Sequence, residues 1–101
     1  MITISKDKSK LQIEVIHQFL TKSYWAKGRT LSQVQTTIDT CLCFGVYFNN
    51  QQIGFGRVAT DYAVFAYIMD VFMLPEHRGK GYSKQLMEAI VNAKELKECK
   101  T

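Results

Sequence analysis

Residues 70–86 read DVFMLPEHRGKGYSKQL and combine the end of an apolar run, a glycine-rich turn and the start of a helical pattern. The apolar run of residues 64–74 ends at Pro75, and Gly79 and Gly81 stand in the turn that follows. Free N–H groups at a helix N-terminus attract anions, and glycines let a ligand approach the backbone with no Cβ in the way. The stretch therefore predicts a buried strand, an anion-binding loop and a helix.

Two common nucleotide-binding patterns do not fit this loop. The dinucleotide fingerprint requires a third glycine, and the Walker pattern requires Ser or Thr where Gly81 follows Lys80. The segment instead resembles the motif of the GNAT family of N-acetyltransferases, Arg/Gln-x-x-Gly-x-Gly/Ala. Arg78, Gly81 and Ser83 fill its three fixed positions. Ser83 departs from the usual glycine or alanine, but it is also small.

The resemblance implies that the cofactor is acetyl-coenzyme A or coenzyme A. In the family the loop amides hold the pyrophosphate, and here these amides would belong to Gly79, Lys80, Gly81, Tyr82 and Ser83. Lys80 and Arg78 would add positive charge near the phosphates. The pantetheine arm would pair like a strand with the backbone of Val71, Phe72 and Met73, and one of those amides would polarise the thioester carbonyl.

Hydrophobic periodicity in the rest of the chain predicts the order strand, helix, helix, three strands, loop, helix. The expected strands are residues 2–5, 42–48, 53–59 and 64–73, and the expected helices are residues 10–24, 32–39 and 84–96. Ser32 is a possible helix cap, and residues 49–52 are the expected hairpin turn. This is the β-α-α-β-β-β-α order of the acyl-CoA N-acyltransferase fold, so the resemblance covers the whole chain. That fold is an α/β (α+β) fold whose mixed, mainly antiparallel sheet is flanked by helices.

A chain of 101 residues makes at most one domain, which we expect to be an N-acetyltransferase domain over residues 1–101. The family continues with a fifth strand, a further helix and a closing pair of strands, and the sequence stops where that fifth strand would begin. We therefore expect the C-terminal strands of the fold to be missing. The continuous apolar character of residues 64–73 suits a central strand. Without a neighbour one of its edges would be bare, and we expect self-association there.

Composition narrows the classes of function. An apolar content of 47% indicates a globular protein, and a net charge of +4 suits an anionic cofactor but is too mild and scattered for nucleic-acid binding. We see no signal peptide and no apolar run long enough for a membrane span, so we expect a cytoplasmic protein that binds no membrane. Cys41 and Cys43 lack the C-x-x-C spacing of a metal site and are expected to be buried thiols, with no metal.

Asp70 is the only acid in the expected strand of residues 64–73. Next to the reactive end of the cofactor, its carboxylate would be a candidate catalytic base that deprotonates the acceptor amine directly or through water. The alternative is a structural carboxylate that bonds a nearby N–H group or Arg57. The sequence leaves both roles open.

The family builds its acceptor pocket from the first two helices and their junction. The junction here includes Tyr24 and Trp25, followed by Lys27 and Arg29. We expect Tyr24, Trp25 and Arg29 to bind an acceptor with apolar and anionic parts, although Trp25 is as well explained as a residue that fills the core.

The resemblance implies an acetyl-CoA-dependent N-acetyltransferase that transfers the acetyl group directly to a primary amine, on a small molecule or a peptide, within a ternary complex. The alternative is a catalytically inactive CoA-binding module, or a fragment that acts only by assembling with another chain. The family's usual thiol-protonating tyrosine lies in the part that this sequence lacks.

Overall fold

A computed structural model describes residues 1–23 and 25–99. Four strands and three α-helices make up this part of the chain. The strands are β1 (Ile2–Ser5), β2 (Leu42–Phe48), β3 (Gln51–Thr60) and β4 (Ala66–Met73). The α-helices are α1 (Ile13–Lys22), α2 (Leu31–Thr40) and α3 (Tyr82–Val91), and short 3₁₀ turns lie at Lys8–Lys10, Pro75–His77 and Lys94–Leu96.

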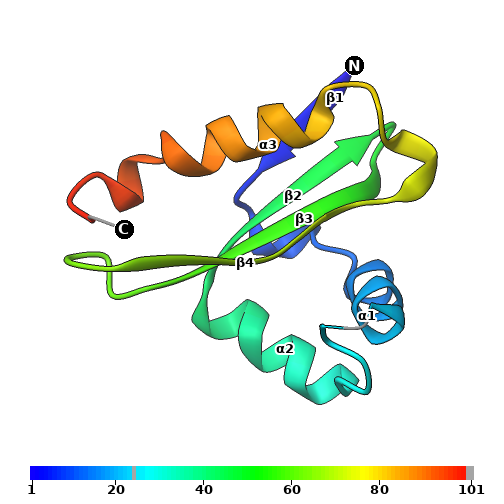
Figure 1. Cartoon of the computed structure of the whole chain (residues 1–101), viewed down its shortest axis with the longest axis horizontal. Coiled ribbons are helices and arrows are strands. Elements are labelled where there is room, and N and C mark those ends of the chain that lie inside the picture. Colours follow the sequence, from blue (N-terminus) through cyan, green and yellow to red (C-terminus); the bar gives the residue numbers. More distant parts are fainter. Residues whose placement is uncertain (24, 100–101) are drawn as a thin grey trace.

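The four strands form one antiparallel sheet in the order β1-β2-β3-β4. Helix α3 covers one face of the sheet, and α1 and α2 lie together on the opposite face (Figure 1). The predicted element order and the antiparallel sheet between helices are therefore confirmed.

Each face of the sheet has its own apolar core. Under α3, Leu86 and Ile90 are fully buried and pack with Phe44 and Val58 of the sheet. On the other face, α1 and α2 bury a second cluster, which includes Ile16, Leu20, Val34, Ile38, Phe55 and Phe72. Because β3 and β4 contribute side chains to both clusters, the sheet is a buried layer between the helices.

Two local predictions were wrong, and polar side chains explain both. Thr30, not Ser32, caps α2, since its hydroxyl accepts from the amide of Gln33 while the Gln33 side chain accepts from the amide of Thr30. The hairpin turn consists of Asn49 and Asn50 alone, because both adopt the positive φ of a tight two-residue turn. Residues 51 and 52 therefore belong to β3.

The boundaries of several elements also differ from the predictions. Helix α3 starts at Tyr82, directly after the second glycine of the loop, and ends at Val91 before a separate 3₁₀ turn. Strand β4 starts at Ala66, because residues 61–65 make a turn around the carboxylate of Asp61. Among the described strands β4 has only β3 as a neighbour, so its other edge is bare, as expected for a sheet that lacks the fifth strand of the fold.

None of the helices within residues 1–23 and 25–99 combines the length and the apolar character that a membrane crossing requires.

Candidate active site at the bulge of β4

The glycine loop presents a run of unbonded backbone amides. Gly79 and Gly81 have φ angles of 78° and 79°, in the left-handed region that favours glycine. Gly81 is the N-cap of α3 and has no side chain to bond the first amides of the helix. Within the described residues, the amides of residues 79–83 donate to no acceptor. A Cβ built at either glycine would have no atom within 4 Å, so the loop is open to a ligand.

Arg78 ties this loop to the sheet. Its Nε donates to the carbonyl oxygen of Met73 at 2.9 Å, and its guanidinium carbon lies 6.0 Å from the ring centre of Phe19. The Phe19 ring in turn stacks on Phe72, with ring centroids 4.1 Å apart. Helix α1, the end of β4 and the glycine loop are thereby held in one arrangement, and Arg78 has one N–H group committed to the strand.

Strand β4 contains a bulge at Asp70. Phe72 is paired with Phe55, whereas Met69 is paired with Arg57, so Asp70 and Val71 together lie opposite the single residue between the two partners on β3. Asp70 has a φ of 55°, which aspartate tolerates better than most residues. Bulges turn side chains toward functional sites. This bulge lies immediately before residues 71–73, whose backbone is expected to hold the cofactor.

The Asp70 carboxylate bridges two elements through two arginines. Its Oδ2 accepts from Nε of Arg57 on β3 at 2.7 Å and from Nη1 of Arg29, between α1 and α2, at 2.6 Å. Its side chain is only 2% exposed. Burial raises the pKa of this carboxyl, but the hydrogen bonds and charges of the two arginines outweigh burial and hold the pKa below its usual value.

Arg57 is the buried end of this bridge. Burial lowers the pKa of its guanidinium, but the bonds to Asp70 and to the sulfur of Cys41, at 3.3 Å from Nη1, raise it overall. The bond between Arg57 and Asp70 is the contact that the structural alternative for Asp70 anticipated.

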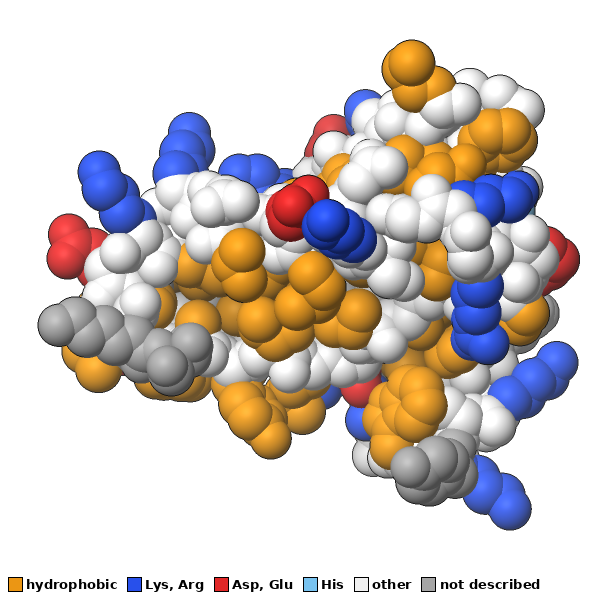
Figure 2. All heavy atoms as spheres, turned by 45° about the horizontal axis from the view of Figure 1, so that its top comes forward, with side chains coloured by type: hydrophobic (Ala, Val, Ile, Leu, Met, Phe, Trp, Pro, Cys, Tyr) orange, Lys and Arg blue, Asp and Glu red, His pale blue; other side chains and the backbone are white. Residues whose placement is uncertain are grey.

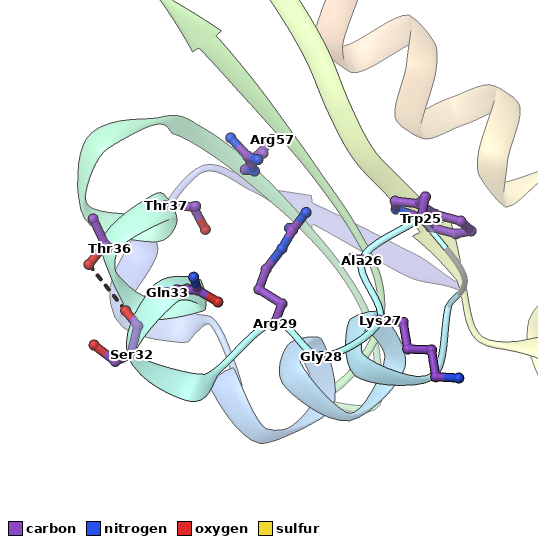
Figure 3. Close-up of a pocket in the computed structure, with 10 residues that line it drawn as sticks. All are labelled: Trp25, Ala26, Lys27, Gly28, Arg29, Ser32, Gln33, Thr36, Thr37 and Arg57. Atoms are coloured by element: carbon purple, nitrogen blue, oxygen red, sulfur yellow. Dashed lines mark hydrogen bonds between the residues drawn. The ribbon is translucent and has the colours of Figure 1, made fainter.

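A hollow of about 680 Å³ opens beside the bridge, between α2 and the segment that joins α1 to α2 (Figure 3). The side chain of Arg29 extends across it toward Arg57, while Lys27 points away from the two arginines. His17 supports the segment, since its Nε2 lies 3.1 Å from the carbonyl oxygen of Arg29.

Trp25 borders this hollow and is half exposed, so the alternative in which it fills the core is wrong. It also borders a second hollow of about 710 Å³, which α1 and residues 74–76 line on the other sides. Trp25 therefore stands between two recesses near the end of β4. Tyr24, the other aromatic residue expected in the acceptor site, lies outside the described residues.

The resemblance implied that the second helix contributes to the acceptor pocket, but sequence reasoning named none of its residues for this role. Gln33, Thr36 and Thr37 line the hollow together with Ser32. Their spacing places the first three on one side of the helix, next to the buried positions Val34 and Ile38. A polar stripe of this kind is also typical of a solvated helix face, so the signal was present but not specific.

The cysteines match the expectation of buried thiols. Cys41 and Cys43 are buried and unbridged, and burial raises the pKa of Cys43 to about 11. No group of potential metal ligands occurs within residues 1–23 and 25–99.

Comparison with known proteins identifies the family. The model of the acetyltransferase (GNAT) family matches residues 12–101, and the chain therefore belongs to this family. A curated candidate acetyltransferase of Gibberella zeae is 26% identical over an alignment that covers 89% of this chain. The chain spans 62% of the length of that relative.

Solved structures agree with this assignment. The crystal structure of a candidate GNAT acetyltransferase from Xanthomonas campestris pv. campestris is 47% identical, with a TM-score of 0.96 over 98% of this chain and 70% of that protein. A GNAT acetyltransferase from Elizabethkingia anophelis, solved with acetyl-CoA bound, is 16% identical with a TM-score of 0.65. The alignment covers 89% of this chain and 55% of the Elizabethkingia protein. At this identity the likeness supports the fold alone.

Replacing Asp70 with asparagine should destabilise the fold in a pH-dependent way. The substitution leaves two arginines without their shared anion, and breaking a buried pair costs about 3 kcal/mol or more. Because the pKa of Asp70 is lowered in the folded state, its contribution is fully present above the unfolded pKa of about 3.9 and is lost as pH falls through the folded value. Urea unfolding of both proteins from pH 7 to pH 3 measures the difference.

The exposed Glu98, replaced with glutamine, is the control and should change stability by less than about 0.5 kcal/mol at every pH. An equal free energy of unfolding for wild type and Asp70→Asn at pH 7 would contradict the bridge.

Proposed function

We propose that this protein is an acetyl-CoA-dependent N-acetyltransferase that transfers the acetyl group directly to a primary amine on a small molecule or a peptide. The observation that carries the proposal is the loop of unbonded amides that follows β4, whose bulged outer edge is unpaired within the described residues. A loop of this kind provides an anion site at the start of a helix, and a strand edge provides donors and acceptors for an extended ligand. Membership of the GNAT family supports the same activity.

Acetyl-CoA fits the residues that are present. The amides of Gly79, Lys80, Gly81, Tyr82 and Ser83 would hold the pyrophosphate, with Lys80 supplying positive charge. The outer edge of β4 at Val71, Phe72 and Met73 would hold the pantetheine arm. Since Arg78 already bonds the carbonyl of Met73, its role would be to fix the loop on the strand while its charge faces the phosphates. The Elizabethkingia anophelis structure, which has the same fold, was solved with acetyl-CoA bound and is the precedent for this cofactor on the fold.

The cofactor supplies an activated acetyl group as a thioester. The acceptor amine would enter from the hollow beside Trp25 and Arg29, and its nitrogen would form a bond to the acetyl carbon as the carbon–sulfur bond breaks. A backbone amide near the bulge of β4 would donate to the carbonyl oxygen of the thioester, which becomes negative while the amine attacks the carbonyl carbon. The amine would lose a proton and the departing thiolate would gain one, and both protons would pass through water in the open hollow.

We infer that Asp70 acts mainly by positioning Arg29. A carboxylate whose pKa is lowered by two arginines is a weak proton acceptor near neutral pH, because a base works best when its pKa lies close to the working pH. The same two bonds hold Arg29 across the acceptor hollow. The general-base role is the alternative, and the second prediction below separates the two roles.

We also propose that the protein is cytoplasmic and that residues 1–101 form one N-acetyltransferase domain. Two solved structures of the same fold are named for different acceptors. One is a ribosomal-protein-alanine N-acetyltransferase from Brucella melitensis, and the other is a glucosamine-6-phosphate N-acetyltransferase from Arabidopsis thaliana. Since acceptors differ this widely on one fold, the acceptor must be inferred from this chain's own hollow.

Cofactor binding should depend on Gly81. Glutamate at this position would put a side chain and a negative charge at the pyrophosphate, so we expect calorimetry to show coenzyme A affinity lowered at least about a hundredfold, the effect of about 3 kcal/mol. Gly81→Ala is the matched control, because it carries the same backbone strain at positive φ without the charge. Equal affinity of all three proteins would refute the assignment of the loop. Coenzyme A binding without thiol release from acetyl-CoA, with any amine, would favour the inactive-module alternative.

Kinetics of Asp70→Asn should separate positioning from base catalysis. If Asp70 positions Arg29, KM for the acceptor rises while the pH dependence of kcat between pH 6 and pH 9 keeps its shape and coenzyme A affinity is unchanged. A general base would instead lose kcat and the acidic limb of the pH profile. A folded variant with unchanged KM, kcat and pH profile would leave Asp70 with a role in stability alone.

A sample of residues 1–101 should self-associate. The outer edge of β4 is unpaired within the described sheet, and the exposed apolar side chains Tyr62, Val64, Phe65 and Tyr67 lie at its N-terminal end. Hydrophobic side chains also gather in a band across the face shown in Figure 2. Light scattering should report dimers or larger species that Tyr67→Lys reduces, and a monodisperse monomer at all concentrations would contradict the expectation.

A further inference from the structure

The acceptor hollow contains more positive charge than the bridge neutralises. Arg29 and Arg57 both bond the same oxygen of Asp70, so two guanidinium groups share a single carboxylate. Within the described residues, one positive charge of this bridge is left without an acidic partner at the wall of the hollow. Lys27 adds a further cation at the rim, although it points away from the arginines (Figure 3).

Both arginines keep N–H groups that can reach a ligand. Within the described residues, Arg29 uses only Nη1, which leaves its Nε and Nη2 without an acceptor. Arg57 uses Nε for Asp70 and Nη1 for Cys41, which leaves Nη2. Arg57 lines the hollow. Its Nη2, which no described residue bonds, is not fully buried, so a ligand in the hollow can reach this atom. Guanidinium groups arranged in this way bind carboxylate and phosphate with paired hydrogen bonds.

Helix α2 adds a neutral donor to the same wall. The Oε1 atom of Gln33 accepts from the amide of Thr30, so its Nε2 remains as a donor toward the hollow. Thr37 donates its hydroxyl proton to the carbonyl of Val34 and therefore offers only lone pairs. The donors for an anion are thus concentrated at Arg29, Arg57 and Gln33.

We propose that the acceptor amine carries an anionic group, a carboxylate or a phosphate, which binds to Arg29 and Arg57 in this hollow. The proposal rests on the proposed acetyltransferase function and specifies its substrate class. An anion at this place neutralises the second guanidinium charge, which the single carboxylate of Asp70 does not balance, and relieves the repulsion between the two guanidinium groups. Arg29 is then the specificity-determining residue, since its side chain is 20% exposed and spans the hollow.

The direction of the ligand follows from the bridge. Asp70 precedes Val71, the first residue of the strand edge assigned to the pantetheine arm, and it holds both arginines. An anion bound to Arg29 is therefore one side chain away from the bulge. The rest of a short acceptor, with its amine, can extend from there toward the thioester.

Three amines of similar size test the proposal: 3-aminopropanoate, 2-aminoethyl phosphate and the neutral propylamine. Thiol release from acetyl-CoA gives kcat/KM for each, and NMR titration of the protein with each amine gives Kd independently of turnover. We expect one of the two anionic amines to exceed propylamine by at least about tenfold in both measurements, the effect of one charge-assisted hydrogen bond. The better anion identifies the group as carboxylate or phosphate.

Arg29→Gln should abolish this preference, so that the ratio of the better anionic amine to propylamine, in kcat/KM and in Kd, falls to within about twofold of one. Lys27→Gln is the matched control. It removes a cation that lines the same hollow but points away from the arginines, so this variant should retain most of the preference. Circular dichroism confirms that each variant is folded.

The outcomes separate this proposal from the proposed function. Absence of coenzyme A binding and of thiol release refutes the acetyltransferase, and the NMR titration still reports whether the hollow selects anions. A wild-type protein that binds the three amines equally overturns the anionic acceptor even when it is an active acetyltransferase. Equal losses in Arg29→Gln and Lys27→Gln also overturn it, since they indicate only the general charge of the surface.

Discussion

The shared carboxylate of Asp70 is the interaction on which the candidate site depends. It joins the segment between α1 and α2, through Arg29, to the buried arginine of β3 and to the bulge of β4. Arg29 lies in the segment between two helices, Arg57 lies within strand β3, and Asp70 lies at the bulge of β4. A buried carboxylate requires partners of opposite charge, and two guanidinium groups satisfy that requirement while fixing the three segments in space.

The same bridge explains why β4 bulges where it does. Asp70 has a positive φ, and residues held in this region persist only when the surroundings over-determine them. Without the extra residue of the bulge, the alternation of side chains along β4 would place each residue after Asp70 on the opposite face of the sheet from the one it occupies. With it, Phe72 reaches the cluster under α1 and α2 and stacks on Phe19, while Met73 reaches the cluster under α3. One backbone irregularity therefore sets both the charged bridge and the packing at the end of the strand.

The parts of the site that were predictable are those specified by local sequence. Gly79 and Gly81 have a conformational requirement that shows directly in the residue type, and the helix after them follows a clear apolar period. The bond between Asp70 and Arg57 was foreseen as one of two alternatives, since both residues lie on neighbouring strands. The share of Arg29 in the same carboxylate was not foreseen, because it depends on how a loop 41 residues away along the chain returns over the sheet. For the same reason the contribution of Gln33 and Thr37 could not be distinguished from an ordinary solvated helix face.

A chain of contacts that begins at Arg78 and continues through aromatic rings also joins the glycine loop to the hollow beside Arg29. Arg78 bonds the last carbonyl of β4 and lies over Phe19, whose ring contacts both Phe72 and Trp25. Trp25 borders the hollow that Arg29 spans. The glycine loop and the hollow are thus linked through Arg78, Phe19 of α1 and the ring contacts of Phe19. In the proposed acetyltransferase, the motif's arginine would help to hold the loop and the hollow at the fixed spacing that direct transfer between two bound reactants would require.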